Sequence, residues 1–175
     1  MTFTVTRLIE IDAGHRIMTH GSKCRHLHGH RYQIEATAES AGLHSSGEQT
    51  DMVLDFSFLK EEMLAEIDGP CDHGFIASCD DKELLSLFAP ADKDTAAWIF
   101  ELCALSRQTG FAETDNCRFG TKLYLINGQP TAEFLARHWF ERLAPRIIER
   151  SGGLAVLKAI VVRETPNCRA EYRPG

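Results

Sequence analysis

Apolar and polar residues alternate over two long stretches near the start of the chain. Between residues 3 and 15 the apolar side chains fall on odd positions, interrupted only by Arg7, and between residues 28 and 38 they fall on even positions. Because successive side chains of a β-strand point to opposite faces, each stretch predicts a long strand with one buried face. His15, His28 and His30 lie on the apolar side of these strands. If the strands pair as a hairpin, the three histidines converge on one face.

The rest of the chain predicts further helices and strands. Asp55 is a candidate N-cap for a helix that runs to about residue 67, and a second helix is expected after Pro130. Residues 154–163 and 168–173 read as two final strands, whereas the middle of the chain is harder to assign. There, helices are expected at residues 81–88 and 94–107 and a strand at 121–127. This order favours one α+β domain over residues 1–175, with an antiparallel sheet and helices on one side.

Length and charge restrict the class of protein. At 175 residues the chain is long enough to bury a sizeable core, and its formal net charge of −6 predicts neither a nucleic-acid partner nor a membrane surface. Arg7, Glu10 and Asp12 interrupt the apolar residues near the start, so we expect no signal peptide, no membrane span and a cytoplasmic location. In that reducing compartment the six cysteines are expected to be thiols, and they are too scattered for a zinc ribbon.

The histidines allow two interpretations. Two imidazoles on one face of a strand (His28 and His30), joined by His15 from a neighbouring strand, suit zinc and leave a fourth coordination position open for water or substrate. The alternative is a set of histidines at the edge of the core, capped by carbonyl groups. His26 shares the parity of His28 but lies nearer the expected loop, so we do not count it as a ligand.

Cys24 stands between Lys23 and Arg25, four residues before His28. Nearby cations favour the thiolate form of a cysteine, and a thiolate can serve either as a metal ligand or as a base; the spacing does not choose between these roles. Lys23 and Arg25 are either solvated loop residues or a means of holding an anionic, phosphorylated ligand.

Two further carboxylates are candidate functional groups. Asp72 precedes His73, and a carboxylate can orient an imidazole as a proton shuttle, although such a pair also occurs by chance. Glu164 ends the most apolar strand, where it can accept paired hydrogen bonds from a guanidine-like edge. The alternative for Glu164 is a salt bridge with Arg163 or Arg169.

These segments together resemble the 6-pyruvoyl-tetrahydropterin and 6-carboxy-tetrahydropterin synthase family. The resemblance covers both ends of the chain, in the family's order, and leaves roughly the middle third unmatched. The matching segments are IDAGHRI, CRHLHGH, MVLDFSFLK, CDHGF, PTAEFLA and VVRETPNCRAEY.

The resemblance implies a tunnelling fold (T-fold), an antiparallel sheet with two helices on one face, and a homo-oligomer with active sites between subunits. It places Zn²⁺ on His15, His28 and His30. It makes Cys24 the proton acceptor, Asp72 and His73 a proton relay, and Glu164, with the adjacent Thr165, the binding site for the pterin ring.

The implied reaction converts 7,8-dihydroneopterin triphosphate to 6-carboxy-5,6,7,8-tetrahydropterin with loss of triphosphate and acetaldehyde. Such an enzyme is a lyase, and its product feeds queuosine and 7-deazaguanine synthesis. The alternatives are 6-pyruvoyl-tetrahydropterin synthase, a related pterin enzyme with an altered substrate, and a zinc-binding interaction protein without catalysis.

The chain departs from the compact family pattern at several positions and by one insertion. Cys71 stands where the family has leucine, Ile76 and Ala77 replace the usual Leu-Asn, and Phe134 is unusual in the second helix. The largest departure is an insertion at about residues 77–129, expected to be partly helical. It is interpreted as a lid, an added oligomer contact or a peripheral decoration.

Overall fold

The computed structural model describes all residues, Met1–Gly175. The chain forms two compact units, the first made of residues 1–10, 32–69 and 135–175 and the second of residues 11–31 and 70–134. Strands β1 (Phe3–His15) and β2 (His28–Ser40) each begin in one unit and end in the other.

Seven strands are hydrogen-bonded in the order β4-β5-β3-β1-β2-β6-β7. The α+β class is confirmed, with one difference from the expected antiparallel sheet. Strand β3 runs parallel to both of its neighbours, β1 and β5, while the β2–β6, β6–β7 and β4–β5 pairs are antiparallel. The remaining strands are β3 (Gly74–Ser78), β4 (Phe111–Thr114), β5 (Lys122–Ile126), β6 (Val156–Thr165) and β7 (Cys168–Tyr172).

Strands β1 and β2 form the predicted antiparallel hairpin. In the first unit Thr6 Oγ1 and Thr37 Oγ1 are 2.9 Å apart, and Gln33 Nε2 donates to Glu10 Oε1 at 2.8 Å. Because the partner in β2 moves backwards as the position in β1 advances, the strands run in opposite directions. Residues 9, 11, 13 and 15 of β1 and residues 32, 34, 36 and 38 of β2 are buried, as the alternation predicted.

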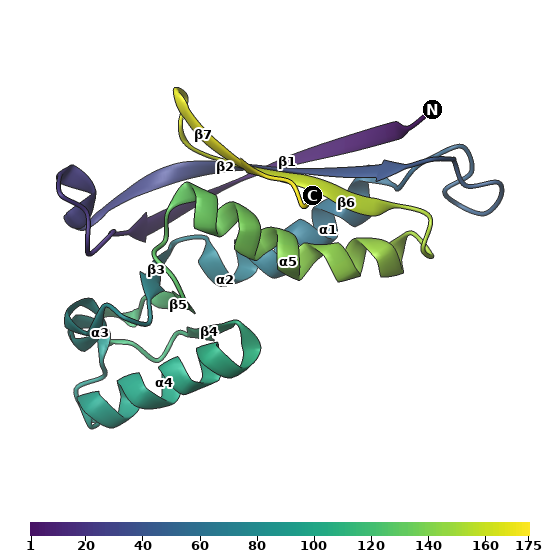
Figure 1. Ribbon diagram of the computed structural model, residues 1–175. Helices are drawn as coiled ribbons and strands as arrows, with labels where there is room; N and C mark the ends of the chain where they lie inside the picture. Colours follow the sequence, from purple (N-terminus) through teal and green to yellow (C-terminus); the bar gives the residue numbers. More distant parts are fainter. The chain divides into compact units, whose positions relative to one another are not determined.

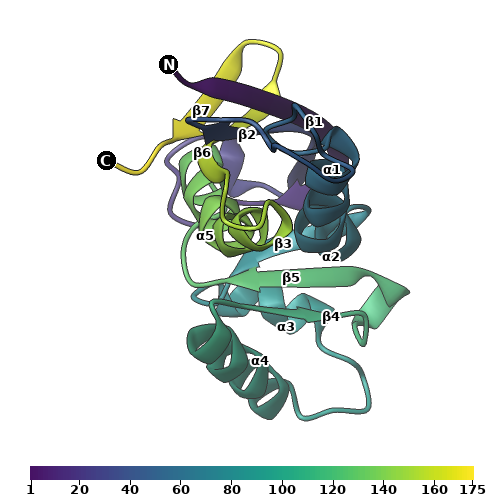
Figure 2. The same ribbon diagram turned by 90° about the vertical axis from the view of Figure 1, so that its right-hand side faces the viewer.

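The helices of the first unit lie on one face of its strands (Figure 1). Helix α1 (Phe56–Met63) starts where predicted, since Asp55 accepts a hydrogen bond from the Ser57 amide at 2.6 Å. It continues through a π-helical turn (Leu64–Asp68) into the short α2 (Gly69–Cys71). Helix α5 (Ala132–Arg150), seen beside α1 in both ribbon views (Figures 1 and 2), buries its apolar side, and each buried leucine or isoleucine contributes about 1.5–3 kcal/mol. Its buried aliphatic and aromatic residues are Leu135, Ala136, Trp139, Phe140, Leu143 and Ile147.

Ion pairs join these two helices along their contact. Glu66 is 8% exposed at its side chain and pairs with Arg142 and, at 2.5 Å, with Arg146. Arg146 also meets Glu62 at 3.2 Å. These carboxylates and guanidinium groups neutralise each other at the edge of the apolar contact between the helices. A lone buried charge at this place would destabilise the contact.

The second unit has a core of its own. Helices α3 (Lys82–Phe88) and α4 (Thr95–Thr109) pack with β3, β4 and β5 (Figure 2). The expected helices at 81–88 and 94–107 and the strand at 121–127 are present as α3, α4 and β5, whereas β3 and β4 were not predicted. The core of this unit consists of Ala77, Cys79, Leu84, Leu85, Ala89, Trp98, Ile99, Cys103, Ala112, Leu123 and Leu125.

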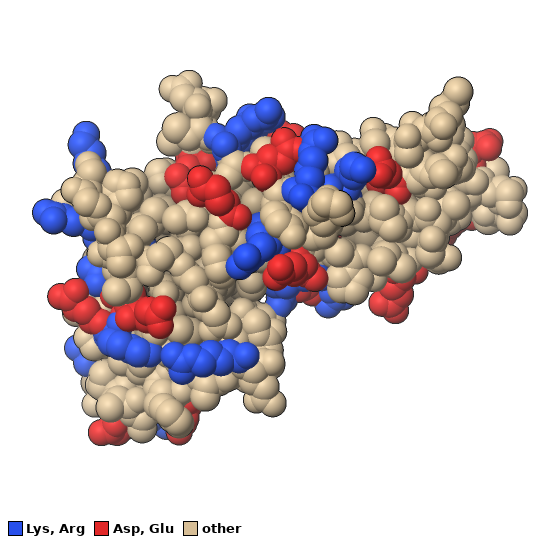
Figure 3. Space-filling model, in the orientation of Figure 1, with Lys and Arg blue, Asp and Glu red and all other residues tan.

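Each helix is too short or too polar to cross a bilayer. On the face drawn in Figure 3, lysine and arginine side chains lie interspersed with aspartate and glutamate.

Candidate metal centre

Three imidazole rings meet at the end of β1 and the start of β2. The ring centroids of His15 and His28 are 4.4 Å apart, and His30 is 5.1 Å from each. One ligand atom from each ring lies within 4.8 Å of the others. The convergence that strand parity predicted is therefore present, and the three side chains are close enough to bind a single ion.

Backbone carbonyls fix which nitrogen faces the cluster in two of these rings. His15 Nδ1 is 2.8 Å from the Pro130 carbonyl oxygen, and His28 Nδ1 is 2.7 Å from that of His26. Because a carbonyl can only accept, each Nδ1 carries the proton and Nε2 is the nitrogen that would bind a metal. The carbonyl caps of the alternative interpretation thus exist, and they orient the rings that converge.

Burial keeps two of the rings neutral. Loss of solvent lowers the pKa of His15 to about 4, with a smaller raising effect from the hydrogen bond to Pro130 and further lowering by the neighbouring rings. Burial, and then the charge of His28, also lowers the pKa of His30. A neutral imidazole has a lone pair for a metal, so the site is ready for an ion near neutral pH.

Glycines allow the two strands to approach closely beside the rings. A Cβ on Gly29 would lie 2.9 Å from the Ala13 carbonyl oxygen, and a Cβ on Gly14 would lie 2.5 Å from the Phe75 ring. The Gly29 contact is with backbone, and only glycine fits so close a backbone approach. The spacing of the histidines therefore depends on the residue between His28 and His30.

Cys24 lies on the loop that connects these strands. It belongs to a short 3₁₀ turn, Lys23–Arg25, and its carbonyl accepts a hydrogen bond from the Ile17 amide at 2.8 Å. That bond ties Cys24 to a residue two positions after His15. The thiol is half-buried and is a free cysteine, whereas Lys23 and Arg25 are exposed. Arg25 lines an open cleft of about 500 Å³.

Asp72 and His73 are held against the same strand ends. His73 Nδ1 is 2.6 Å from Asp72 Oδ2, and the His73 side chain is 77% exposed. The backbone of Asp12 binds both, since its amide donates to Asp72 Oδ1 at 2.8 Å and its carbonyl accepts from the His73 amide at 2.7 Å. Burial raises the pKa of Asp72, but the hydrogen bonds from the Asp12 amide and His73 outweigh it and lower the pKa. Asp72 is therefore ionised and orients the His73 ring.

His73 has a left-handed backbone with φ of 55°. Such a conformation is unfavourable for a residue with a side chain and is maintained only where the surroundings impose it. Here the bond between the His73 amide and Asp12 imposes it, and the ring is presented to solvent.

Glu164 lies in the first unit, near the end of β6. It is half-buried, and the β6–β7 register shifts between Arg163 and Thr165, so Glu164 occupies an irregular position that re-aims its side chain. Arg163 pairs with Glu35 at 3.0 Å. Thr165 is exposed next to it.

Sequence reasoning missed two contributors to the site. Pro130 supplies the carbonyl that holds His15, and Asp12 holds the Asp72–His73 pair while pairing with Arg31 at 2.7 Å. Asp12 had a visible signal, because it lies on the wet face of β1 near the histidines. Pro130 had none, because its role is played by its backbone.

With this geometry established, comparison with known proteins decides the family. A model of the 6-pyruvoyl tetrahydropterin synthase family matches residues 4–175. The chain belongs to the 6-pyruvoyl tetrahydropterin synthase family.

Within the 6-pyruvoyl tetrahydropterin synthase family, several relatives match nearly the whole chain. A 6-carboxy-5,6,7,8-tetrahydropterin synthase of Rickettsia felis is 32% identical over 166 residues, which are 95% of this chain and 96% of the relative. One of Aquifex aeolicus is 29% identical over 192 residues and 99% of each chain. Both matches cover at least 95% of this chain, so they extend over most of the segment at 77–129.

Solved structures of the family show the same fold. An uncharacterized protein (WS1659) from Wolinella succinogenes superposes with a TM-score of 0.72 at 21% identity, covering 100% of this chain and 99% of its own. The 6-pyruvoyltetrahydropterin synthase of Plasmodium vivax gives a TM-score of 0.57 at 17% identity and covers 98% of each chain. The tunnelling fold expected from the sequence is therefore confirmed for this member of the family.

The donor set fits zinc. Three imidazoles, two of them oriented through Nδ1 by carbonyls, are a typical ligand set for a zinc ion that keeps a position open for catalysis. Cys24 lies outside this set of three imidazoles.

Proposed function

We propose that this chain is a zinc-dependent 6-carboxy-5,6,7,8-tetrahydropterin synthase, which converts 7,8-dihydroneopterin triphosphate with loss of triphosphate and acetaldehyde. The observation that carries the proposal is the His15–His28–His30 cluster with its carbonyl-oriented rings. Relatives of that name, 31–32% identical over nearly their whole length, support the choice of reaction. By its chemistry the activity is that of a lyase.

The proposed roles follow from the chemistry of each side chain. Zinc bound to the three imidazoles supplies Lewis acidity, which makes protons of a bound hydroxyl and its neighbouring carbon easier to remove. Cys24, tied by its backbone beside the His15 strand end, accepts a proton from the substrate side chain. Three histidines already suffice as ligands, which is why we assign the thiol to proton transfer.

His73 moves the second proton. Its Nδ1 is held by Asp72, so Nε2 of the exposed ring is the atom that gives or takes the proton at the substrate. The ionised Asp72 stabilises the protonated imidazole and keeps the ring in one orientation.

The substrate is recognised at both ends. Glu164, with Thr165 beside it, accepts hydrogen bonds from the 2-amino pyrimidinone edge of the pterin. Lys23 and Arg25, exposed on the loop with Cys24, attract the triphosphate.

We further propose that copies of the chain assemble into a homo-oligomer with active sites between subunits. The pairing of β1 with β3 is confined to Ala13–His15, and β7 is the last strand of the sheet, so the sheet has unpaired edges in the first unit. Unpaired edges favour strand addition by another copy. Light scattering of the purified protein tests this, and a monomer at micromolar concentration would contradict it.

The proposed setting is the cytoplasm, in the synthesis of queuosine and other 7-deazaguanines. All six cysteines are free thiols, which fits a reducing compartment.

The test of function is direct. Zinc-loaded protein is incubated with 7,8-dihydroneopterin triphosphate, and mass spectrometry follows 6-carboxy-5,6,7,8-tetrahydropterin and acetaldehyde. Cys24→Ala is expected to lower turnover about 10²–10⁴-fold, as loss of a general base does. Cys117→Ala, at another half-buried free cysteine, is the matched control and is expected to retain activity. No turnover by zinc-loaded wild-type protein would defeat the proposal.

The same assay decides the product. The alternative of a 6-pyruvoyl product has specific support, because the family model and the Plasmodium vivax neighbour carry that description. Retention of a three-carbon side chain, with no acetaldehyde, would assign the chain to the pyruvoyl reaction instead.

A further inference from the structure

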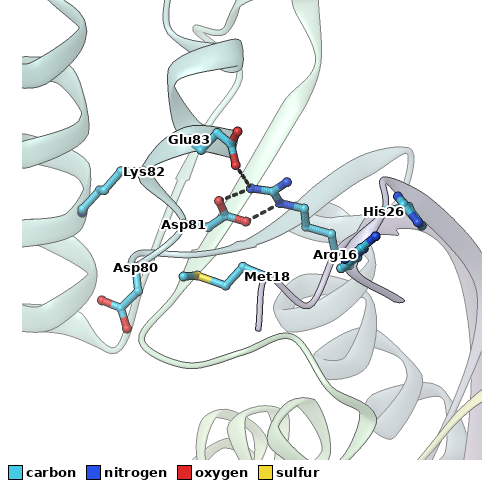
Figure 4. A pocket seen from close by; sticks show the side chains of 8 residues that line it. Arg16, Met18, His26, Asp80, Asp81, Lys82 and Glu83 are labelled. Carbon is cyan, nitrogen blue, oxygen red and sulfur yellow. Dashed lines mark hydrogen bonds and ion pairs between the residues drawn. The ribbon is translucent and has the colours of Figure 1, made fainter. Parts of the chain in front are cut away.

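The segment at 77–129 holds the end of β1 immediately after His15. Arg16 donates to Asp81 through two nitrogens, from Nε to Oδ2 at 2.6 Å and from Nη2 to Oδ1 at 2.6 Å. A third bond runs from Arg16 Nη2 to Glu83 Oε2 at 3.0 Å. Figure 4 shows both carboxylates directed at the Arg16 guanidinium. This two-pronged geometry restricts the arginine in distance and in angle.

Asp81 is itself fixed in place. Its side chain is 3% exposed, and Oδ1 also accepts the Leu84 amide at 3.1 Å as the N-cap of α3. The neighbouring Lys82 points away from it (Figure 4) and donates instead to the Cys79 carbonyl at 2.6 Å. The carboxylate therefore belongs to the core of the second unit and is satisfied by one helix end and one arginine.

Two other contacts hold the same strand end. Gln129 Oε1 accepts the Met18 amide at 3.2 Å, and the next residue, Pro130, accepts His15 Nδ1. His15 is also paired in register with Ile76 of β3. Three parts of the chain therefore hold His15 and the backbone that follows it. They are strand β3, the start of helix α3, and the residues Gln129 and Pro130 that follow β5.

We propose that Arg16 and Asp81 are positioning residues for the metal centre, and that the segment at 77–129 is a supporting part of that centre. The inference rests on the zinc site of the proposed function. A metal ligand must place its nitrogen about 2.0–2.1 Å from the ion, so a strand end that is free to shift weakens binding. The ion pair removes that freedom at the residue next to His15.

A substitution at Asp81 separates the ion pair from the helix cap. Asp81→Asn retains the size and the capping oxygen, because asparagine and aspartate are equally good N-caps, and loses the charged pairing with Arg16. Asp94→Asn is the matched control, since Asp94 caps α4 by accepting the Ala97 amide at 2.8 Å and has no arginine on it. Each variant makes the same aspartate-to-asparagine change at one helix N-cap of the second unit.

Three measurements are made without any pterin. Competition with a chromophoric chelator gives zinc affinity, cobalt(II) substitution gives the visible spectrum of the ligand set, and urea unfolding gives the stability of the metal-free protein. Asp81→Asn is expected to weaken zinc binding about tenfold, as loss of outer partners does at metal sites, and to alter the cobalt spectrum. Asp94→Asn is expected to leave affinity and spectrum unchanged.

The outcomes separate this inference from the proposed function. If Asp81→Asn binds zinc and cobalt as the wild type does, the positioning role is overturned, whether or not the protein turns over a pterin. If zinc is weakened and the wild type shows no turnover, the positioning role stands and the proposed reaction fails. Wild-type protein that binds no zinc overturns both.

A milder variant covers the case in which Asp81→Asn does not fold. Arg16→Lys retains the charge but cannot make the paired contact, so an intermediate loss of zinc affinity and a shifted cobalt spectrum are expected. Unchanged zinc affinity in folded Arg16→Lys would equally overturn the inference.

Discussion

Each unit holds a nearly buried carboxylate against arginine, but the two ion pairs are attached to different structures. In the first unit Glu66 joins the turn after α1 to Arg142 of α5. In the second unit Asp81 joins the start of α3 to Arg16, the residue after a candidate metal ligand. The first pair connects two helices across a core, and the second connects a helix to the strand end that carries the site. The same chemistry therefore stabilises packing in one unit and ligand geometry in the other.

The largest expected effect is removal of a ligand in the second unit. His28→Ala should abolish zinc retention and lower turnover at least 10³-fold, because two imidazoles alone hold the ion weakly and its Lewis acidity is lost. Elemental analysis and the product assay measure this. His20→Ala, at an exposed histidine of the loop between β1 and β2, should retain both the zinc and the turnover. Full zinc content in His28→Ala would break the assignment of the site.

Acid should destabilise both units. Burial lowers the pKa of His15 and of His138 to about 4, with Arg142 and Arg137 adding to the effect on His138. An unfolded histidine titrates near 6.5, so between these pH values the unfolded state binds more protons, and the stability of the metal-free protein falls as pH falls. Each ring accounts for up to about 3 kcal/mol.

Urea unfolding from pH 7 to pH 4 checks that sign. His138→Gln should flatten the curve by its own share and leave zinc affinity at pH 7 unchanged, because His138 is not one of the three candidate ligands. If the free energy of unfolding of His138→Gln fell with pH as steeply as that of the wild type, His138 would not be the source of the predicted share of the pH dependence.

Glu66→Gln sharpens the comparison of the two ion pairs. The change leaves Arg142, whose side chain is 18% exposed, without its countercharge, and should cost about 2 kcal/mol of unfolding free energy. Zinc affinity should stay that of the wild type, in contrast to Asp81→Asn. Glu141→Gln, in an exposed pair 3.8 Å from Arg137, should cost less than about 0.5 kcal/mol.

The smallest expected effect concerns backbone strain. Phe119 has φ of 72° and is 82% exposed, so it adopts a left-handed conformation without burying its ring. Phe119→Asn should raise the free energy of unfolding by about 0.5 kcal/mol, since asparagine tolerates this conformation better. His73→Asn should relieve a similar strain but lower turnover, because asparagine lacks the imidazole that is the proposed proton carrier. If Phe119→Asn and His73→Asn were equally active, the proposed functional difference between these two left-handed residues would be contradicted.

Local patterns predicted much of the first unit and the two strands that continue from it into the second unit. Alternation over residues 3–15 and 28–38 predicted two strands, their hairpin and the meeting of three histidines, because a period of two fixes which side chains share a face. The cap at Asp55 and the apolar spacing of α5 were equally local signals. The two final strands, β6 and β7, were also predicted from the local sequence.

The second unit shows where local patterns end. Strands β3 and β4 are short, 5 and 4 residues, and β3 pairs in parallel with strands that are distant in sequence or separated from it by two helices. Parallel strands are not joined by a tight turn, so no turn motif near β3 predicts its pairing. Asp81 was visible as a helix start, but its partner Arg16 lies 65 positions away, which only the folded chain reveals. The roles of Cys24, Glu164 and the loop cations remain predictions.

The close approach of Gly29 to Ala13 has an evolutionary consequence. A methyl group at that position would lie 2.9 Å from a carbonyl oxygen, so the strands would have to separate where the imidazoles meet. One inherited change at a residue that touches no ion can therefore disable the centre while every ligand is still encoded. In descendants of such a gene, alanine between two intact histidines would mark a lineage that is losing its metal before it loses its histidines.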